Sequence, residues 1–299
     1  MNRFIRLRLL AMLLCLPFLL IFISGCGSSS QKKDEPPVYS PLQVLVPEAT
    51  GKETLGSSPM ILDVSNISQG YFIAQSDSSD LTCSLQIISP SGVLYSYFIA
   101  PGESATVTFT EGSGDYTITG YQQVQGDQYA ALYSETVTVQ LENDFLPFLY
   151  PNQYVNFTPD SKASQLALSL IDEDTVDVDA LQQIYDYVVS NLTYDYEKAD
   201  TVTTGYLPDV DETLKTGTGI CFDYAALTTA MLRSCDIPCK LQIGYAGDIK
   251  HAWIDVYIRS KGWVNQAVSF KGDTWTLMDP TFDSNSDDKE AIQDYIGDE

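Results

Sequence analysis

Three side chains that together can perform thiol chemistry lie in the last third of the chain. Cys221 follows two glycines, Gly217 and Gly219, and opens an apolar-periodic segment that continues to Leu232. This pattern predicts a helix with Cys221 in its first turn, where unpaired backbone N–H groups and the helix dipole favour a thiolate. A structural cysteine is the alternative, because most free cysteines are small buried hydrophobes.

The one histidine of the chain supplies a candidate base. His251 lies about thirty residues after Cys221, in an alternating run that indicates a strand, and Asp279 ends a second strand-like run just before a proline. A thiol nucleophile needs a base to accept its proton, and that base needs a carboxylate to fix its tautomer. Cys221, His251 and Asp279 can fill these three roles.

Four motifs occur in a fixed order: Gly-x-Cys-x-Asp-Tyr-Ala (219–225), Ile-Pro-Cys-Lys-Leu-Gln-Ile-Gly-Tyr (237–245), His-Ala-Trp (251–253) and Trp-x-Leu-Met-Asp-Pro-Thr (275–281). Over residues 158–285 the chain thereby resembles the bacterial transglutaminase-like superfamily. The resemblance implies a papain-like core, with a cysteine-bearing helix packed on an antiparallel sheet that carries histidine and aspartate. It implies that Cys221 is the nucleophile, His251 the general base and then acid, and Asp279 the orienting carboxylate.

The pattern of the first 26 residues indicates a targeting segment. Residues 1–26 combine three arginines with the apolar run Leu9–Ile23, which is shorter than the roughly 20 residues of a spanning helix. The run ends in Ile-Ser-Gly-Cys, which resembles a bacterial lipobox and implies lipidation of Cys26. An ordinary signal peptide or an uncleaved anchor is the alternative. Residues 27–42 are expected to be a flexible linker, so the protein is expected outside the cytoplasm, lipid-anchored to the bacterial membrane.

The acidic composition argues against binding to nucleic acid or to other anionic polymers. The formal charge is −24, which repels nucleic acid and anionic polymers. A solvated acidic exterior is the simplest interpretation, and a cationic substrate is the alternative.

Apart from Cys15, Cys26 and Cys221, an odd number of cysteines remains: Cys83, Cys235 and Cys239. Buried free thiols are favoured over a Cys235–Cys239 disulfide, and no second histidine or cysteine pair completes a metal site, so no cofactor is predicted.

The chain is predicted to be α+β, with two domains after the leader. Residues 43–145 are expected to form an antiparallel, immunoglobulin-like β-sandwich, which is either a recognition module or a spacer. Its seven expected strands are 59–65, 71–75, 81–88, 93–99, 104–110, 115–121 and 129–141. Residues 146–299 are expected to form the transglutaminase-like domain, entered through a Pro- and aromatic-rich connector.

Within that second domain the pattern predicts helices near 163–170 and 181–188 and strands at 240–245, 251–258, 263–268 and 274–278. Trp253 should share the strand face of His251. The acidic run 172–179 is expected to cap the second helix rather than to bind calcium. Residues from Asp283 on are expected to form a solvated acidic tail, since an EF-hand would need a glycine at position 288.

The loop 197–216 precedes the nucleophile. It is a candidate wall of a substrate groove because of Gly205, Pro208 and its acids Asp209, Asp211 and Glu212. Acyl chemistry also needs donors to an oxyanion. The backbone N–H of Cys221 is one candidate, and Tyr194 or Tyr196 is the second.

These observations predict a thiol enzyme that attacks amide bonds of a peptide or a glutamine side chain through an acyl-enzyme. Hydrolysis is favoured over acyl transfer to an amine, because no residue indicates an amine site. The alternative is a non-catalytic surface module that binds peptide or cell-wall material. The sequence predicts a protein or peptide substrate and a membrane contact through lipid, and it makes no prediction of oligomeric state.

Overall fold

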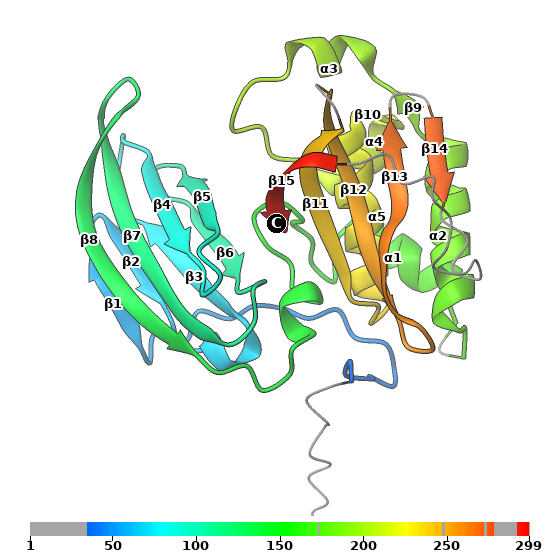
Figure 1. Ribbon diagram of the computed structural model, residues 1–299, viewed down its shortest axis with the longest axis horizontal. Coiled ribbons are helices and arrows are strands. Elements are labelled where there is room, and N and C mark those ends of the chain that lie inside the picture. Colours follow the sequence, from blue (N-terminus) through cyan, green and yellow to red (C-terminus); the bar gives the residue numbers. More distant parts are fainter. Residues whose placement is uncertain (1–34, 173, 247–248, 272–273, 278–291, 299) are drawn as a thin grey trace, which may run out of the picture. The chain divides into compact units, whose positions relative to one another are not determined.

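The computed structural model describes residues 35–172, 174–246, 249–271, 274–277 and 292–298, with side chains for 35–172, 174–245 and 251–265 (Figure 1). Within these ranges, none of the helices has both the length and the apolar character needed to cross a bilayer. Cys26 and Asp279 lie outside the described residues.

The N-terminal domain consists of two four-stranded antiparallel sheets. One has the order β1 (Thr54–Ser57), β2 (Met60–Asp63), β3 (Tyr71–Ser76), β6 (Ser104–Thr108); the other has the order β5 (Leu94–Ile99), β4 (Cys83–Ile88), β7 (Gly114–Gln125), β8 (Gln128–Val139). Alternate side chains of both sheets, such as Leu62, Leu85 and Ile118, are fully buried in one cluster. The expected antiparallel sandwich is confirmed, with one strand more than expected. The sequence missed β1 because its four residues are mostly exposed and carry no alternation.

The C-terminal domain packs helices on a five-stranded antiparallel sheet. Its helices include α1 (Lys162–Leu170), α2 (Asp177–Asn191) and α5 (Cys221–Ser234). Its sheet has the order β14 (Thr274–Leu277), β13 (Gly262–Lys271), β12 (Ile249–Ile258), β11 (Cys239–Ala246), β15 (Ile292–Asp298). Helix α5 contacts α1, α2, β11 and β12 and is buried on almost every side, which makes it the centre of this core (Figure 1). The predicted α+β fold class is therefore confirmed.

The strand that carries His251 is oriented by its apolar residues. Ala252, Ile254, Val256 and Ile258 of β12 belong to the same buried cluster as α5. Because side chains alternate along a strand, His251 and Trp253 lie on the opposite face of β12. Both are nearly buried, at 7% and 4% exposed.

The segment 197–216, expected to be a loop that walls a substrate groove, is partly helical, and its acids Asp209, Asp211 and Glu212 line no pocket wall. The segment contains two short helices, α3 (Tyr196–Thr201) and α4 (Val210–Thr216), which begin where Asp195 and Asp209 accept hydrogen bonds from N–H groups of the next turn. Asp211 accepts N–H bonds at the start of α1, from Lys162 and Ala163 (3.0 Å each). These acids cap helix N-termini, which is where carboxylates are most stabilising.

The C-terminal tail also differs from its expectation. Residues 292–298 are not a solvated tail but form β15, an edge strand antiparallel to β11. Strand pairing of this kind uses backbone groups, so acidic residues within 292–298 do not prevent it. The acids that suggested and then excluded a calcium loop fall largely outside the described residues.

The cysteines and the segment before the sandwich complete the description. Cys83, Cys235 and Cys239 are buried free thiols, as the sequence favoured, and burial raises the pKa of Cys235 and Cys239 to about 12. Part of the segment expected to be a linker contacts the C-terminal domain. The N–H of Tyr39 donates to the Asp236 carboxylate at 3.0 Å, and Arg259 donates to the Pro37 carbonyl at 3.4 Å.

Candidate active site

The start of α5 is fixed by a short strand pair. Two residues before Cys221, β10 (Thr218–Gly219) pairs in parallel with β9 (Thr193–Tyr194). The N–H of Thr193 donates to the Gly217 carbonyl and that of Asp195 to the Gly219 carbonyl, both at 2.8 Å. This pairing brings Tyr194, from a segment almost thirty residues earlier, beside the first turn of α5.

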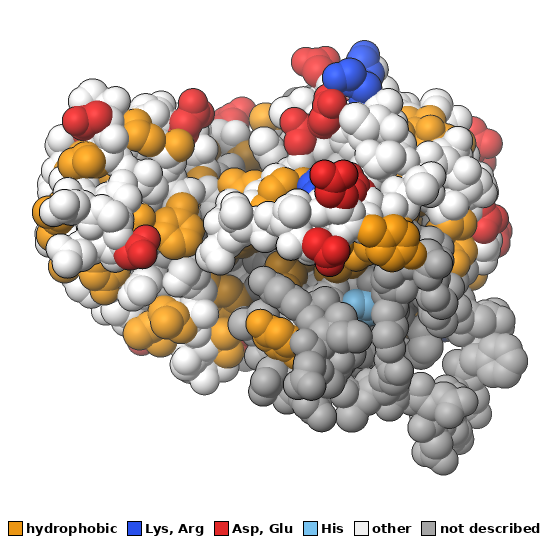
Figure 2. Space-filling model, turned by 90° about the horizontal axis from the view of Figure 1, so that it is seen from above, with side chains coloured by type: hydrophobic (Ala, Val, Ile, Leu, Met, Phe, Trp, Pro, Cys, Tyr) orange, Lys and Arg blue, Asp and Glu red, His pale blue; other side chains and the backbone are white. Residues whose placement is uncertain are grey.

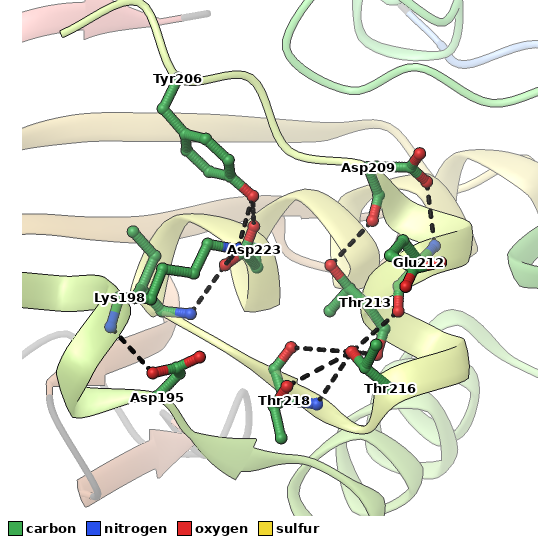
Figure 3. Close-up of polar contacts among 10 residues, drawn as sticks. Asp195, Lys198, Tyr206, Asp209, Glu212, Thr213, Thr216, Thr218 and Asp223 are labelled. Atoms are coloured by element: carbon green, nitrogen blue, oxygen red, sulfur yellow. Dashed lines mark hydrogen bonds and ion pairs between the residues drawn. The ribbon is translucent and has the colours of Figure 1, made fainter. Parts of the chain in front are cut away.

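The first turn of α5 is capped by its own carboxylate. Asp223 is fully buried, and its Oδ2 accepts the N–H of Ile220 at 2.8 Å. This bond satisfies one of the donors that a helix N-terminus leaves unpaired. The same carboxylate receives Lys198 and the hydroxyl of Tyr206 (Figure 3).

Burial and hydrogen bonds shift the pKa of the Cys221 thiol in opposite directions. Burial raises the pKa of Cys221, and the nearby Asp223 charge adds to that rise, whereas hydrogen bonds from the N–H groups of Ala252 and Phe222 lower it. The net direction is upward. The sequence predicted that the helix terminus would favour the thiolate; the N–H groups are present, but burial outweighs them.

Cys221 and His251 line one pocket of about 410 Å³. The N–H of Ala252, the residue after His251, hydrogen-bonds the Cys221 sulfur, which links the start of α5 to this point of β12. A small part of the histidine, coloured pale blue, is visible at the surface in Figure 2. The structure thus places Cys221 and His251 in the lining of one pocket, while Asp279 falls outside the described residues.

The rest of the pocket is mostly apolar and aromatic, with Thr203 and Thr204 as its polar side chains. Its walls come from the end of α3 and the following residues Val202–Tyr206, from the start of α5, and from β11 and β12. Residues 199 and 202–206 of the segment 197–216 wall this pocket, as expected. No carboxylate of the described residues lines it, so the acids of that segment are not part of the wall. The full lining is Tyr194, Ala199, Val202, Thr203, Thr204, Gly205, Tyr206, Ile220, Cys221, Phe222, Ile243, His251 and Ala252.

Tyr194 and Tyr196, the two candidate oxyanion donors, have different environments in the structure. The hydroxyl oxygen of Tyr194 accepts a hydrogen bond from the N–H of Cys221. Burial raises the pKa of Tyr194 to about 12. It is therefore a protonated donor at neutral pH. Tyr196 is 57% exposed and does not line the pocket.

Sequence analysis missed Lys198 and Tyr206 as partners of this site, because neither belongs to a recognisable motif. A weak signal was available in Asp223, a carboxylate in the apolar first half of the α5 segment, because a carboxylate that is buried there requires partners. Among the described residues no group of three or more histidine, cysteine, aspartate or glutamate side chains could hold a metal ion.

The domain that carries this pocket is similar to known proteins. Residues 164–280, about two-fifths of the chain, match the family model of the transglutaminase-like superfamily. No curated protein sequence matches the chain.

Two solved structures are similar to it. A candidate cysteine protease from Cytophaga hutchinsonii is 18% identical, with a TM-score of 0.35 over 73% of this chain and 78% of the other. A candidate protease from Parabacteroides distasonis is 15% identical, with a TM-score of 0.30 over 68% of this chain and 43% of the other. On the match of the family model, residues 164–280 form a transglutaminase-like domain, and its central helix begins at Cys221.

Proposed function

We propose that the protein is a thiol hydrolase that cleaves amide bonds of peptides, with Cys221 as nucleophile, His251 as general base and acid, and Asp279 as the carboxylate that orients His251. One observation carries the proposal. Cys221, at the first residue of α5, and His251 line the same pocket, and a backbone N–H adjacent to His251 reaches the Cys221 sulfur. Nucleophile and base must lie within reach of each other for this chemistry.

In the proposed reaction, the Cys221 sulfur attacks the carbonyl carbon and its proton passes to His251. The oxyanion accepts hydrogen bonds from the Cys221 N–H and the Tyr194 hydroxyl. The C–N bond then breaks, and the departing amine takes the proton from His251, which leaves a thioester. His251 next removes a proton from water, water attacks the thioester carbonyl, and the acid is released as the thiol is restored.

The direction of the Cys221 pKa specifies the resting state of the nucleophile. Because burial raises the pKa of Cys221, the resting enzyme holds a neutral thiol. Proton transfer to His251 then accompanies attack on the substrate rather than preceding it. The N–H groups of Ala252 and Phe222 stabilise the sulfur as its charge develops.

Water is the proposed acyl acceptor. Among the described residues that line the pocket there is no carboxylate to bind an amine, so transfer to an amine has no evident acceptor site. The apolar lining favours an uncharged, apolar substrate side chain next to the bond that is cleaved. Acyl transfer from glutamine, which would cross-link proteins, is the alternative.

The proposed location follows from the leader sequence. Cys26 carries a lipid, and the mature protein acts on peptides outside the cytoplasm, at the bacterial membrane. Radiolabelled fatty acid should enter the expressed chain and be lost in Cys26→Ser. Incorporation that persists in Cys26→Ser would exclude this anchor.

The function is tested with the full-length protein and a mixture of peptides of diverse sequence, with new termini mapped by mass spectrometry. The wild type should generate new termini, and Cys221→Ala, His251→Ala and Asp279→Ala should generate none, while the surface control Lys215→Ala cleaves at the wild-type rate. A parallel assay offers a glutamine-containing protein and a fluorescent primary amine. Amine incorporation without cleavage would replace hydrolysis by transfer. Full activity in any of the three site variants would contradict the assigned roles.

One observation favours a second candidate, a non-catalytic peptide-binding module. Burial raises the pKa of Cys221, as expected of an inert structural thiol. In that case peptides would bind the pocket without turnover, and Cys221→Ala would leave their affinity unchanged.

A further inference from the structure

We propose that Lys198, Tyr206 and Asp223 form a latch that holds the pocket wall 202–206 against the helix of the nucleophile and thereby sets which substrate side chain the pocket accepts. The latch residues are positioning residues, not catalytic ones. The inference rests on the proposed function for its kinetic part, and a chemical probe of Cys221 tests it independently.

The latch centres on Asp223, whose side chain is fully buried. A buried carboxylate is costly unless its charge is neutralised and its oxygens are hydrogen-bonded. Oδ2 accepts from the Ile220 N–H at 2.8 Å and from Lys198 Nζ at 2.7 Å, and Oδ1 accepts the Tyr206 hydroxyl. Each oxygen is therefore hydrogen-bonded and the charge is paired.

Lys198 joins the other two members. Its Nζ lies 2.7 Å from both the Tyr206 hydroxyl and Asp223 Oδ2, and 4.5 Å from the centre of the Tyr206 ring. Lys198 belongs to α3. The start of this helix is fixed by the carboxylate of Asp195, which accepts the Lys198 N–H at 2.8 Å. Figure 3 shows the lysine and the tyrosine converging on Asp223 from two different segments.

Tyr206 carries the latch into the pocket. Its ring lines the pocket wall and lies edge-on to Phe222, with ring centres 6.2 Å apart, while its hydroxyl points to Asp223. Gly205, the residue before it, has φ +86°, a conformation that favours glycine, and the Tyr206 N–H donates to the Thr203 carbonyl at 3.3 Å within the wall. The hydroxyl bond of Tyr206 is the side-chain link from this wall to α5.

The latch couples two parts of the site that the sequence separates. Asp223 lies two residues after Cys221 in the first turn of α5, whereas the wall belongs to a connection between α3 and α4. Loss of the Tyr206 hydroxyl would release the wall without removing Cys221, His251 or the N–H groups at the sulfur. The expected effect is weaker, less selective substrate binding with the thiol chemistry retained.

The test is Tyr206→Phe in the full-length protein, with Tyr95→Phe as matched control, because Tyr95 also donates its hydroxyl to a carboxylate, Glu111, at 2.9 Å in the sandwich. On peptides with a large apolar side chain, Tyr206→Phe should raise KM about tenfold while kcat stays within about threefold, as expected for loss of a hydrogen bond to a charged group. Peptides with a small side chain should be affected much less. Tyr95→Phe should match the wild type.

The independent measurement is alkylation of Cys221, followed site by site by mass spectrometry. Iodoacetamide is small and should react at the same rate in wild type and Tyr206→Phe. N-phenylmaleimide is bulky and aromatic, and its rate relative to iodoacetamide should fall about fivefold when the wall is released. This comparison stands even if the wild type cleaves no peptide.

A second variant, Lys198→Met, removes the charge that neutralises Asp223. It should also lower the rate of N-phenylmaleimide relative to that of iodoacetamide. Its control is Lys215→Met, which removes the exposed ion pair with Glu212. If Tyr206→Phe keeps the wild-type ratio of the two reagents, the latch does not position the wall. If both reagents slow equally, Tyr206 supports the nucleophile itself and the selectivity role is wrong.

Discussion

Gly219 lies directly against the side chain of Asp223, so closely that a Cβ atom at position 219 would stand 2.7 Å from the Asp223 Cβ and 3.0 Å from its Oδ2. The glycine before the nucleophile is therefore required by a carboxylate four residues later, not by a turn. Gly217 has the other role, because its φ of +64° ends α4 in the left-handed conformation.

Gly219→Ala should displace Asp223 and with it the cap of α5 and the latch. We expect kcat/KM to fall at least about tenfold and the apparent Tm to drop by several degrees, since buried contacts below 3 Å must be relieved by movement. Gly126→Ala is the control. Gly126, unlike Gly219, has a positive φ, +52°, and it has open space around it. Its variant should lose some stability and keep full activity; equal activity in both variants would show that Asp223 tolerates the shift.

The reactivity of Cys221 should follow its raised pKa. Because the protonated thiol is favoured, the thiolate forms at higher pH than in a free cysteine, and the rate of iodoacetamide alkylation should still rise above pH 8.5. His251→Gln should slow the reaction at pH 7 by removing the proton acceptor. Cys83, Cys235 and Cys239 are internal controls of buried thiols. A rate that is already constant below pH 7 in the wild type would indicate a thiolate–imidazolium pair that outweighs burial.

Tyr194→Phe tests the second oxyanion donor. Loss of the hydroxyl next to the Cys221 N–H should lower kcat about a hundredfold with little change in KM, since the bond is made to charge that develops in the transition state. Tyr196→Phe is the neighbouring control and should retain wild-type kcat. Equal activity of the two variants would remove Tyr194 from the mechanism.

The sequence located most of the fold because hydrophobic periodicity reports burial. It placed α5 and its first residue, Cys221, and it placed α1, α2 and seven strands of the sandwich within a few residues. It missed α3 and α4, since these helices have two turns or fewer and depend on the caps Asp195 and Asp209, which resemble ordinary loop acids.

The site was harder to predict where it depends on tertiary packing. The helix terminus at Cys221 is visible in the sequence, but the burial that reverses the direction of its pKa is not. The bond between Tyr206 and Asp223 joins residues of two elements, and periodicity contains no information about such a pairing. The same holds for Tyr194, which reaches Cys221 only through the β9–β10 pair.

Stability should depend on pH through Asp236. This residue is 2% exposed, has φ +59° and accepts the N–H of Tyr39, and burial raises the pKa of its carboxyl to about 7 despite that bond and the nearby Arg259. A carboxyl whose folded pKa lies above its unfolded value stabilises the fold below pH 4, and that contribution is lost as the pH rises to about 7. The loss could reach about 4 kcal/mol.

Asp236→Asn removes this ionisation and retains both the acceptor for Tyr39 and the tolerance of a positive φ. The variant should therefore have a higher apparent Tm than the wild type at pH 8 and a similar one at pH 4. Asp63→Asn is the opposite case. Burial would raise the pKa of Asp63, but hydrogen bonds from Ser65 and Gly51 lower it, so this variant should lose stability at pH 7 and little at pH 3. An Asp236→Asn protein that is no more stable than the wild type at pH 8 would mean that the carboxylate is already well solvated or paired in the folded chain.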